Sequence, residues 1–168
     1  LVAAGKLDVT GLRDVWESFV VTTVSNPLPG VRQALVIAGS DRRGTAYGVF
    51  TLSEAIGVSP WHWWADVNPR RRAALFVRPG VYRQGPPDVK YRGIFINDED
   101  WGLQEWAEKN YEAGAGEAKD IGPKTYAKVF ELLLRLKANY IWPAMHDSTK
   151  PFNFYPENKV VADRYAIV

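Results

Sequence analysis

The second half of the chain alternates apolar runs with polar loops, and this order limits the folds that it can adopt. Residues 91–96 are typical of a strand, and the polar run 97–102 follows them directly. A helix is predicted from residue 123. A second strand, residues 139–142, leads into another loop. Strand, loop, helix and strand in this order begin either a (β/α) barrel or a doubly wound sheet.

The helix that begins at Pro123 is the clearest element in the sequence. Proline fits the first helical position, where no amide donor is needed. The apolar residues after it recur at helical spacing and predict a buried stripe of Tyr126, Val129, Phe130 and Leu133. Residues 103–121 show little periodicity, which favours a loop, and a last short helix is expected near Lys159.

The first half predicts a smaller α/β layer. Asp41 or Ser40 is placed to cap its helix, and Gly57 suits the end of that helix. Residues 26–30 predict a turn. The expected elements are strands over residues 15–25, 34–38 and 74–77 and a helix over residues 44–56.

Two segments rich in proline and glycine lie in the middle of the chain and predict a boundary between two domains. Pro79-Gly80 and Gly85-Pro86-Pro87 separate the two halves, so the boundary is expected after residue 85. Residues 1–85 then form one α/β domain, and residues 86–168 begin another.

Composition argues against several classes of function. A formal net charge of +2 is too small for a nucleic-acid-binding surface. The chain has no cysteine and only two histidines, so a metal centre is not expected, and no cofactor motif is present. No apolar run approaches the ~18 residues of a membrane-spanning helix. We therefore expect no nucleic acid, membrane, metal or cofactor as a partner.

Polar residues that follow the two strands of the second half are the candidate functional residues. In a barrel, side chains just past the carboxyl ends of the strands line the active site. Asn97, Asp98 and His146 would lie there, and Trp142 ends a strand on the same face. Glycoside hydrolysis needs two carboxyl groups from different elements, so the acids at residues 98–100 can supply only one. Each of these side chains also has a structural alternative, in packing, in a turn or in a solvated loop.

Four segments carry a resemblance to a known family: residues 34–48, 57–67, 91–102 and 137–146. The first two resemble the accessory domain of glycoside hydrolase family 115, the xylan α-glucuronidases. The third and fourth resemble the first two barrel strands of that family with their loops. The similarity covers nearly the whole chain, from about Gly5 onward.

This resemblance implies a fold, an activity and a site. The fold would be a small N-terminal α/β (α+β) accessory domain, with its start upstream of Leu1, followed by the first two βα units of a truncated (β/α)8 TIM barrel. The activity would be the removal, with inversion, of glucuronic acid or its 4-O-methyl form from xylan or xylooligosaccharides, without a metal. Asp98 would act in catalysis by positioning water or substrate, and Asn97, Trp142 and His146 would bind substrate.

Length limits what this chain can do alone. A (β/α)8 barrel needs ~250 residues, whereas 80 remain from Val89 onward. The resemblance places the general acid, a Glu, and a further catalytic Asp on later strands, so we expect this fragment to be inactive in isolation.

Several points stay open on the sequence alone. Expected partners are glucuronoxylan or an acidic xylooligosaccharide, and a homodimer is an option for the full-length protein. A secreted or periplasmic location is favoured over a cytoplasmic one, but the compartment is undecided. The alternatives are a non-catalytic carbohydrate-binding module and a hexosaminidase-like glycosidase that shares the accessory domain.

Overall fold

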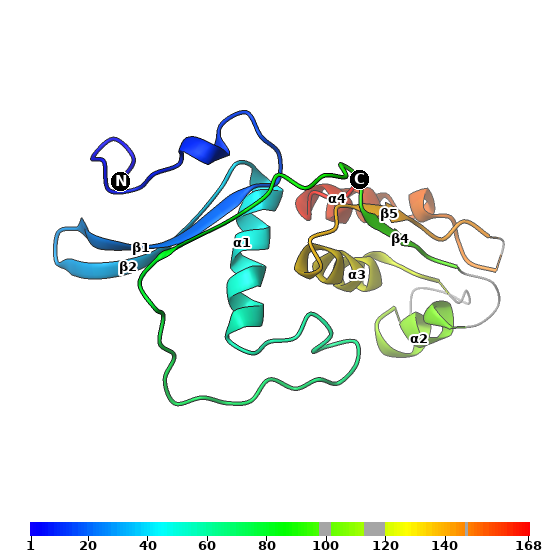
Figure 1. Ribbon diagram of the computed structural model, residues 1–168. Coiled ribbons are helices and arrows are strands. Elements are labelled where there is room, and N and C mark those ends of the chain that lie inside the picture. Colours follow the sequence, from blue (N-terminus) through cyan, green and yellow to red (C-terminus); the bar gives the residue numbers. More distant parts are fainter. Residues whose placement is uncertain (98–101, 113–119, 147) are drawn as a thin grey trace. The chain divides into compact units, whose positions relative to one another are not determined.

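The computed structural model describes residues 1–97, 102–112, 120–146 and 148–168 (Figure 1). These residues form two compact units, Leu1–Lys90 and Tyr91–Val168. Each unit contains both strands and helices, which confirms a mixed α/β chain.

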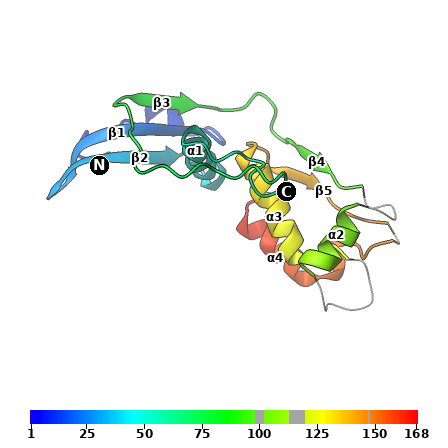
Figure 2. The same ribbon diagram turned by 90° about the horizontal axis from the view of Figure 1, so that it is seen from below.

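An antiparallel sheet of three strands is the central layer of the first unit. Strand β1 (Phe19–Leu28) lies between β2 (Val31–Gly39) and β3 (Val81–Gln84), as Figure 2 shows. The hairpin between β1 and β2 is tighter than the sequence predicted. Strand β1 runs into the expected turn as far as Leu28, with a register shift after Ser25. A bulge of this kind lets the strand bend and continue through Pro27, which cannot donate to a strand partner.

The third strand lies elsewhere than the sequence predicted. Residues 74–77 belong to no strand, and Phe76 is 93% exposed. The strand is instead β3, which pairs with the free edge of β1 through Val20 and Arg83 and their neighbours. Because a strand is defined by its hydrogen-bonded partner, an apolar run without a partner remains irregular chain.

Helix α1 (Arg42–Ala55) packs on β1 and β2 and is capped as predicted. The Asp41 Oδ1 atom accepts a hydrogen bond from the Gly44 amide at 2.7 Å, and Oδ2 accepts one from the Glu17 amide at 2.8 Å. A β-carbon on Gly44 would lie 2.3 Å from the Ser18 carbonyl oxygen. The start of the helix therefore approaches the chain before β1 so closely that only glycine fits.

The second unit is built on a β-α-β arrangement. Strands β4 (Gly93–Phe95) and β5 (Tyr140–Trp142) pair in parallel, and α3 (Pro123–Arg135) lies between them in the chain. Parallel neighbours need such a crossover connection. The predicted stripe on α3 is confirmed, because all four residues are buried: Tyr126, Val129, Phe130 and Leu133.

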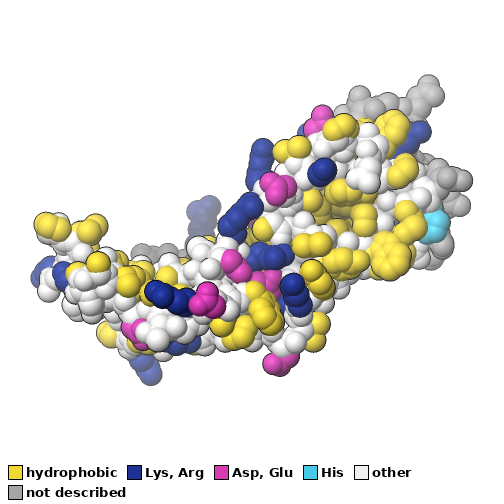
Figure 3. Space-filling model, turned by 90° about the horizontal axis from the view of Figure 1, so that it is seen from above, with side chains coloured by type: hydrophobic (Ala, Val, Ile, Leu, Met, Phe, Trp, Pro, Cys, Tyr) yellow, Lys and Arg dark blue, Asp and Glu magenta, His cyan; other side chains and the backbone are white. Residues whose placement is uncertain are grey.

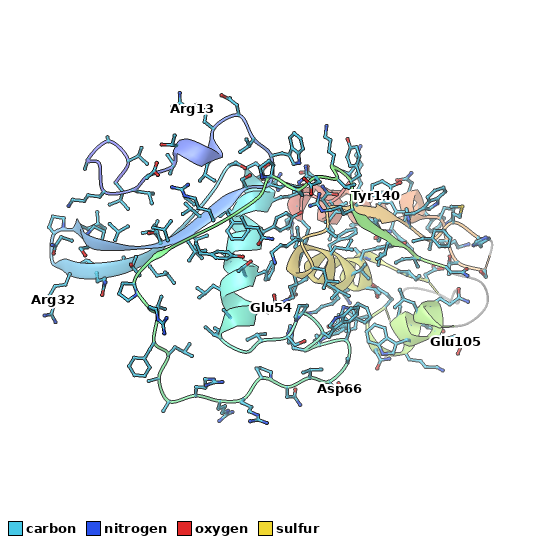
Figure 4. All side chains as sticks on the ribbon, viewed as in Figure 1. Arg13, Arg32, Glu54, Asp66, Glu105 and Tyr140 are labelled. Atoms are coloured by element: carbon cyan, nitrogen blue, oxygen red, sulfur yellow. The ribbon has the colours of Figure 1, made fainter. Side chains whose placement is uncertain are left out.

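A glycine allows the two parallel strands to approach each other. A β-carbon on Gly93 would lie 1.8 Å from the carbonyl oxygen of Tyr140. Gly93 pairs with Tyr140, the first residue of β5; Tyr140 is labelled in Figure 4. Any larger residue at this position would have to push the strands apart.

Two further α-helices complete the second unit. Helix α2 (Leu103–Asn110) occupies a segment that was predicted to be loop, because Gln104 and Ala107 are buried on one face of it. Helix stability in proteins comes mainly from such packing rather than from local propensity. Helix α4 (Pro156–Arg164) packs on α3 and begins slightly earlier than predicted.

Two short 3-10 helices accompany these elements, η1 (Thr10–Leu12) in the first unit and η2 (Phe152–Phe154) in the second. Among the described residues, no helix is long and apolar enough to cross a membrane.

Candidate functional site

The carboxyl ends of β4 and β5 lie next to each other. The rings of Phe95 and Trp142, the last residues of the two strands, are 5.9 Å apart and meet edge to face at 84°. The Ile96 amide then donates to the Trp142 carbonyl at 2.9 Å. Asn97 follows Ile96 and is exposed. The structure therefore brings Asn97 and Trp142 to one edge of the sheet.

Asp98, the predicted catalytic carboxylate, lies outside the described residues, and so do Glu99 and Asp100. Its role remains a prediction. Its neighbour Asn97 is the last described residue before this part of the chain.

His146 lies in the segment that joins β5 to α4, which we call the β5–α4 connection; its described residues are 143–146 and 148–155. The side chain of His146 is half-buried, and its carbonyl accepts a hydrogen bond from the Thr149 amide at 3.1 Å. Two residues earlier, the buried Ala144 amide donates to the Tyr126 hydroxyl at 3.2 Å. This contact anchors the segment that contains His146 to helix α3.

A buried carboxylate that the sequence analysis missed lies just before α3. Asp120 is only 4% exposed. Its Oδ1 atom accepts a hydrogen bond from the Lys150 amide at 3.1 Å, and its Oδ2 atom accepts a very short one from the Tyr155 hydroxyl. This hydrogen bond, together with burial and the nearby negative charge, raises the pKa of Tyr155 to about 12. Nothing local in the sequence indicates that Asp120 and Tyr155 are partners.

A second buried acid caps the same helix. The Glu112 carboxylate accepts hydrogen bonds from the amide and the hydroxyl of Thr125, at 2.9 and 3.1 Å. Thr125 lies in the first turn of α3, where amides have no partner within the helix and negative charge is favourable. A β-carbon on Gly122 would lie 2.7 Å from the Glu112 carboxyl carbon, so glycine makes room for this cap.

The amino ends of β4 and β5 are held by a separate polar group. Asn139 is 1% exposed, and its Oδ1 atom accepts a hydrogen bond from the Arg92 amide at 3.0 Å. The Arg92 guanidinium donates to the Lys137 carbonyl at 3.0 and 2.8 Å. These contacts fix the start of both strands, opposite the edge with Asn97 and Trp142. They are therefore structural contacts.

Exposed hydrophobic side chains gather over the second unit (Figure 3). Four of them come from β4, β5 and the residues after β5: Ile94, Phe95, Trp142 and Met145. Trp142 is 51% exposed, so its ring is partly free to contact another molecule. Aromatic rings of this kind offer a broad apolar face with a polar N–H at one edge.

The first unit contains a hollow of about 750 Å³, lined by residues of the N-terminal segment and the end of β2. Its charged residues are Asp8 and Arg13, and Arg13 extends outward in Figure 4. Hydrogen bonds from the Thr10 hydroxyl and amide, and then the charge of Arg83, lower the pKa of Asp8. The Asp8 carboxylate is thus already occupied by groups of its own unit.

Within the described part of the chain, no three His, Asp or Glu side chains lie close enough together to hold a metal ion.

Comparison with known proteins found a matching family model and eleven matching chains of solved structures. The sequence model described as glycosyl hydrolase family 115 matches residues 84–168. One similar solved structure is described as a family 115 4-O-methyl-α-glucuronidase with specificity for decorated arabinogalactans. It is 43% identical with a TM-score of 0.87, over 99% of this chain and 21% of that chain. This chain therefore spans about a fifth of that relative's length. No curated protein sequence matches.

Proposed function

This chain belongs to glycosyl hydrolase family 115, and on that basis we propose that it is part of an inverting α-glucuronidase. The enzyme would remove glucuronic acid, or its 4-O-methyl form, from a decorated polysaccharide. The observation that supports this most strongly is the similarity to a solved 4-O-methyl-α-glucuronidase, at 43% identity over 99% of the chain. A hexosaminidase or a binding module would not account for such extended identity.

In this proposal, residues 1–85 form the accessory domain and residues 86–168 begin a (β/α)8 barrel with β4 and β5 as its first strands. Their parallel pairing and the helical crossover support this. Val168 adds further support from the other edge of β5. Its amide donates to the Asn139 carbonyl at 2.9 Å, and its carbonyl accepts from the Ile141 amide at 2.9 Å.

These two hydrogen bonds form the pattern of a parallel bridge. On one edge of β5, the Trp142 carbonyl accepts a hydrogen bond from the amide of Ile96, which follows β4. On the other edge, the Ile141 amide donates to the carbonyl of Val168. A third strand position therefore follows β5 in chain order. The same order also begins one half of a doubly wound sheet, so it is the family membership that favours the barrel.

We assign the roles within the site as follows. Asp98 is the catalytic carboxylate that positions water or substrate. Asn97 and His146 bind the polar groups of the uronic acid, its carboxylate included, and Trp142 packs against a sugar ring. Inversion needs a second carboxyl group ~6.5–9.5 Å from the first, which a later strand would supply.

Two polymers are candidate substrates. Glucuronoxylan, or an acidic xylooligosaccharide derived from it, is the substrate that the sequence resemblance implies. Decorated arabinogalactan is the second candidate, because the similar solved enzyme is described as specific for it. Both present an α-linked uronic acid to the same site, so the catalytic residues would be shared.

The test is to express the complete enzyme that contains this chain and to offer it both polymers. We expect release of the uronic acid, observed by NMR first as the β anomer, and its loss in an Asp98→Asn variant. An N-acetylhexosaminide serves as the control substrate. Activity on that control, or no uronic acid from either polymer, would contradict the proposed function.

A further inference from the structure

Asp120 joins the segment between β4 and α3 to the β5–α4 connection. It lies near the end of that segment, after helix α2 and just before α3. Both of its partners, the Lys150 amide and the Tyr155 hydroxyl, belong to the β5–α4 connection. A carboxylate that is 4% exposed needs such partners, because an unpaired buried charge is very unfavourable.

A second contact fixes the same connection nearer to β5. The Ala144 amide donates to the Tyr126 hydroxyl, and the Tyr126 ring packs edge to face on Phe152, 4.8 Å between centroids. The Phe152 amide donates in turn to the Ala144 carbonyl at 3.3 Å. The connection is therefore held near both of its ends.

Two of the predicted substrate-binding residues lie close to these anchors in the chain. Trp142 precedes Ala144 by two residues, and His146 lies between Ala144 and Lys150. Neither side chain needs to contact Asp120 to depend on it. If Lys150 and Tyr155 were released, the backbone that contains His146 would lose the two hydrogen bonds that join it to Asp120.

We propose that Asp120 is a positioning residue for the uronic-acid site. It holds the β5–α4 connection so that His146 faces the substrate. This inference rests on the proposed function, because it is that function which makes His146 and Trp142 binding residues. Asp120 itself does not contact the substrate.

Glu112 provides a matched control. It is also a buried acid, 9% exposed, whose carboxylate contacts the first turn of α3. Its hydrogen-bond partner is Thr125, within α3, rather than a residue of the β5–α4 connection. A Glu112→Gln variant therefore tests the general effect of altering a buried carboxylate here, without releasing Lys150 or Tyr155.

The first measurement is amide hydrogen exchange on the complete enzyme and on its Asp120→Ala, Tyr155→Phe and Glu112→Gln variants. We expect faster exchange in residues 148–155 for Asp120→Ala and, to a smaller extent, for Tyr155→Phe. Glu112→Gln should affect only the first turn of α3. Unchanged exchange of the β5–α4 connection in a folded Asp120→Ala enzyme would overturn the inference.

The second measurement is the kinetics of uronic acid release by the same proteins. Misplacement of binding groups by about 1 Å can cost on the order of 10- to 100-fold in rate, so we expect kcat/KM to fall by that amount for Asp120→Ala. Asp120→Asn should recover part of it, because its amide oxygen can still accept from Lys150. Glu112→Gln should leave kcat and KM within about twofold of wild type by the same geometric argument.

The two measurements separate the failure of the inference from the failure of the proposed function. If exchange increases but kcat and KM stay at the wild-type values, Asp120 is only structural and the inference is wrong. If the wild-type enzyme releases no uronic acid, the proposed function fails, and with it the assignment of Asp120 to a uronic-acid site. If Asp120→Ala is too unstable to assay, Tyr155→Phe, which removes only one hydroxyl, decides by the same two criteria.

Discussion

Trp142 packs its indole edge to face against the ring of Phe95, and this pair joins the last residues of two parallel strands. The contact orients the tryptophan while leaving it 51% exposed. An aromatic ring that is held by one neighbour and exposed to solvent is well suited to pack against a sugar. The pair thus connects the packing of the sheet to the proposed binding site.

Replacing Trp142 with Ala should weaken substrate binding while the enzyme stays folded. We expect KM of the complete enzyme to rise about tenfold, which corresponds to ~1.4 kcal/mol. The lost aromatic pair by itself should lower the free energy of unfolding by about 0.5–1.5 kcal/mol. Steady-state kinetics and urea denaturation measure the two effects. Trp61→Ala, at an exposed tryptophan of the first unit, is the control, and an equal change in KM there would contradict the assignment.

Replacing Gly93 with Ala should destabilise the second unit. The added β-carbon would overlap the Tyr140 carbonyl oxygen, since only 1.8 Å separates the two positions. Overpacking of this kind costs about 1–3 kcal/mol or more, and urea denaturation of the 168-residue chain would measure it. Gly11→Ala is the matched control, because its β-carbon would meet the nearest atom at an ordinary 3.7 Å. Equal stability of the two variants would disprove the close approach of β4 and β5.

Replacing Asp41 with Ala should lower the free energy of unfolding of the first unit. The variant loses the cap of α1 at Gly44 and the hydrogen bond to the Glu17 amide. A lost cap costs about 0.5–2 kcal/mol. Because the hydrogen bond to the Glu17 amide is lost as well, we expect a loss of stability toward the upper end of this range. Asp41→Asn keeps an acceptor for the Gly44 amide, so it should recover part of the lost stability, as measured by thermal denaturation. A neutral effect of Asp41→Ala would show that the cap is not needed.

Tyr155 should lose its hydroxyl proton at a higher pH than an ordinary tyrosine. Its pKa is about 12 in the folded chain, against an ordinary value of 10.0. Because the folded state favours the neutral hydroxyl, this stabilising contribution is complete below pH 10.0 and is lost as the pH rises toward 12.

Two measurements check this titration. The ultraviolet absorbance of tyrosinate should show a component that titrates near pH 12, and Tyr155→Phe should reduce it. The loss of stability between pH 10.0 and 12 should be smaller in Tyr155→Phe than in the wild-type chain. Tyr82→Phe, at an exposed tyrosine of the first unit, is the control and should retain the late component. An undiminished late component in Tyr155→Phe would assign the raised pKa to another tyrosine.

Local patterns in the sequence were enough to predict much of the secondary structure. The cap at Asp41, the start of α3 at Pro123 and its buried stripe all depend on residues within one or two turns of each other, and the structure confirms them. The carboxyl ends of β4 and β5 were also predictable, because a strand that ends in polar residues is visible in the sequence. Asn97 and Trp142 could therefore be named from the sequence, although their roles stay predictions.

Only the tertiary structure decided the pairings between distant residues. Strand β3 formed at residues 81–84 rather than 74–77 because the edge of β1 accepts it there. Helix α2 formed because one of its faces is buried. The contact of Asp120 with Tyr155 joins residues 35 positions apart. A local pattern specifies the preference of a segment, whereas burial and hydrogen-bond partners from elsewhere in the chain decide whether that preference is met.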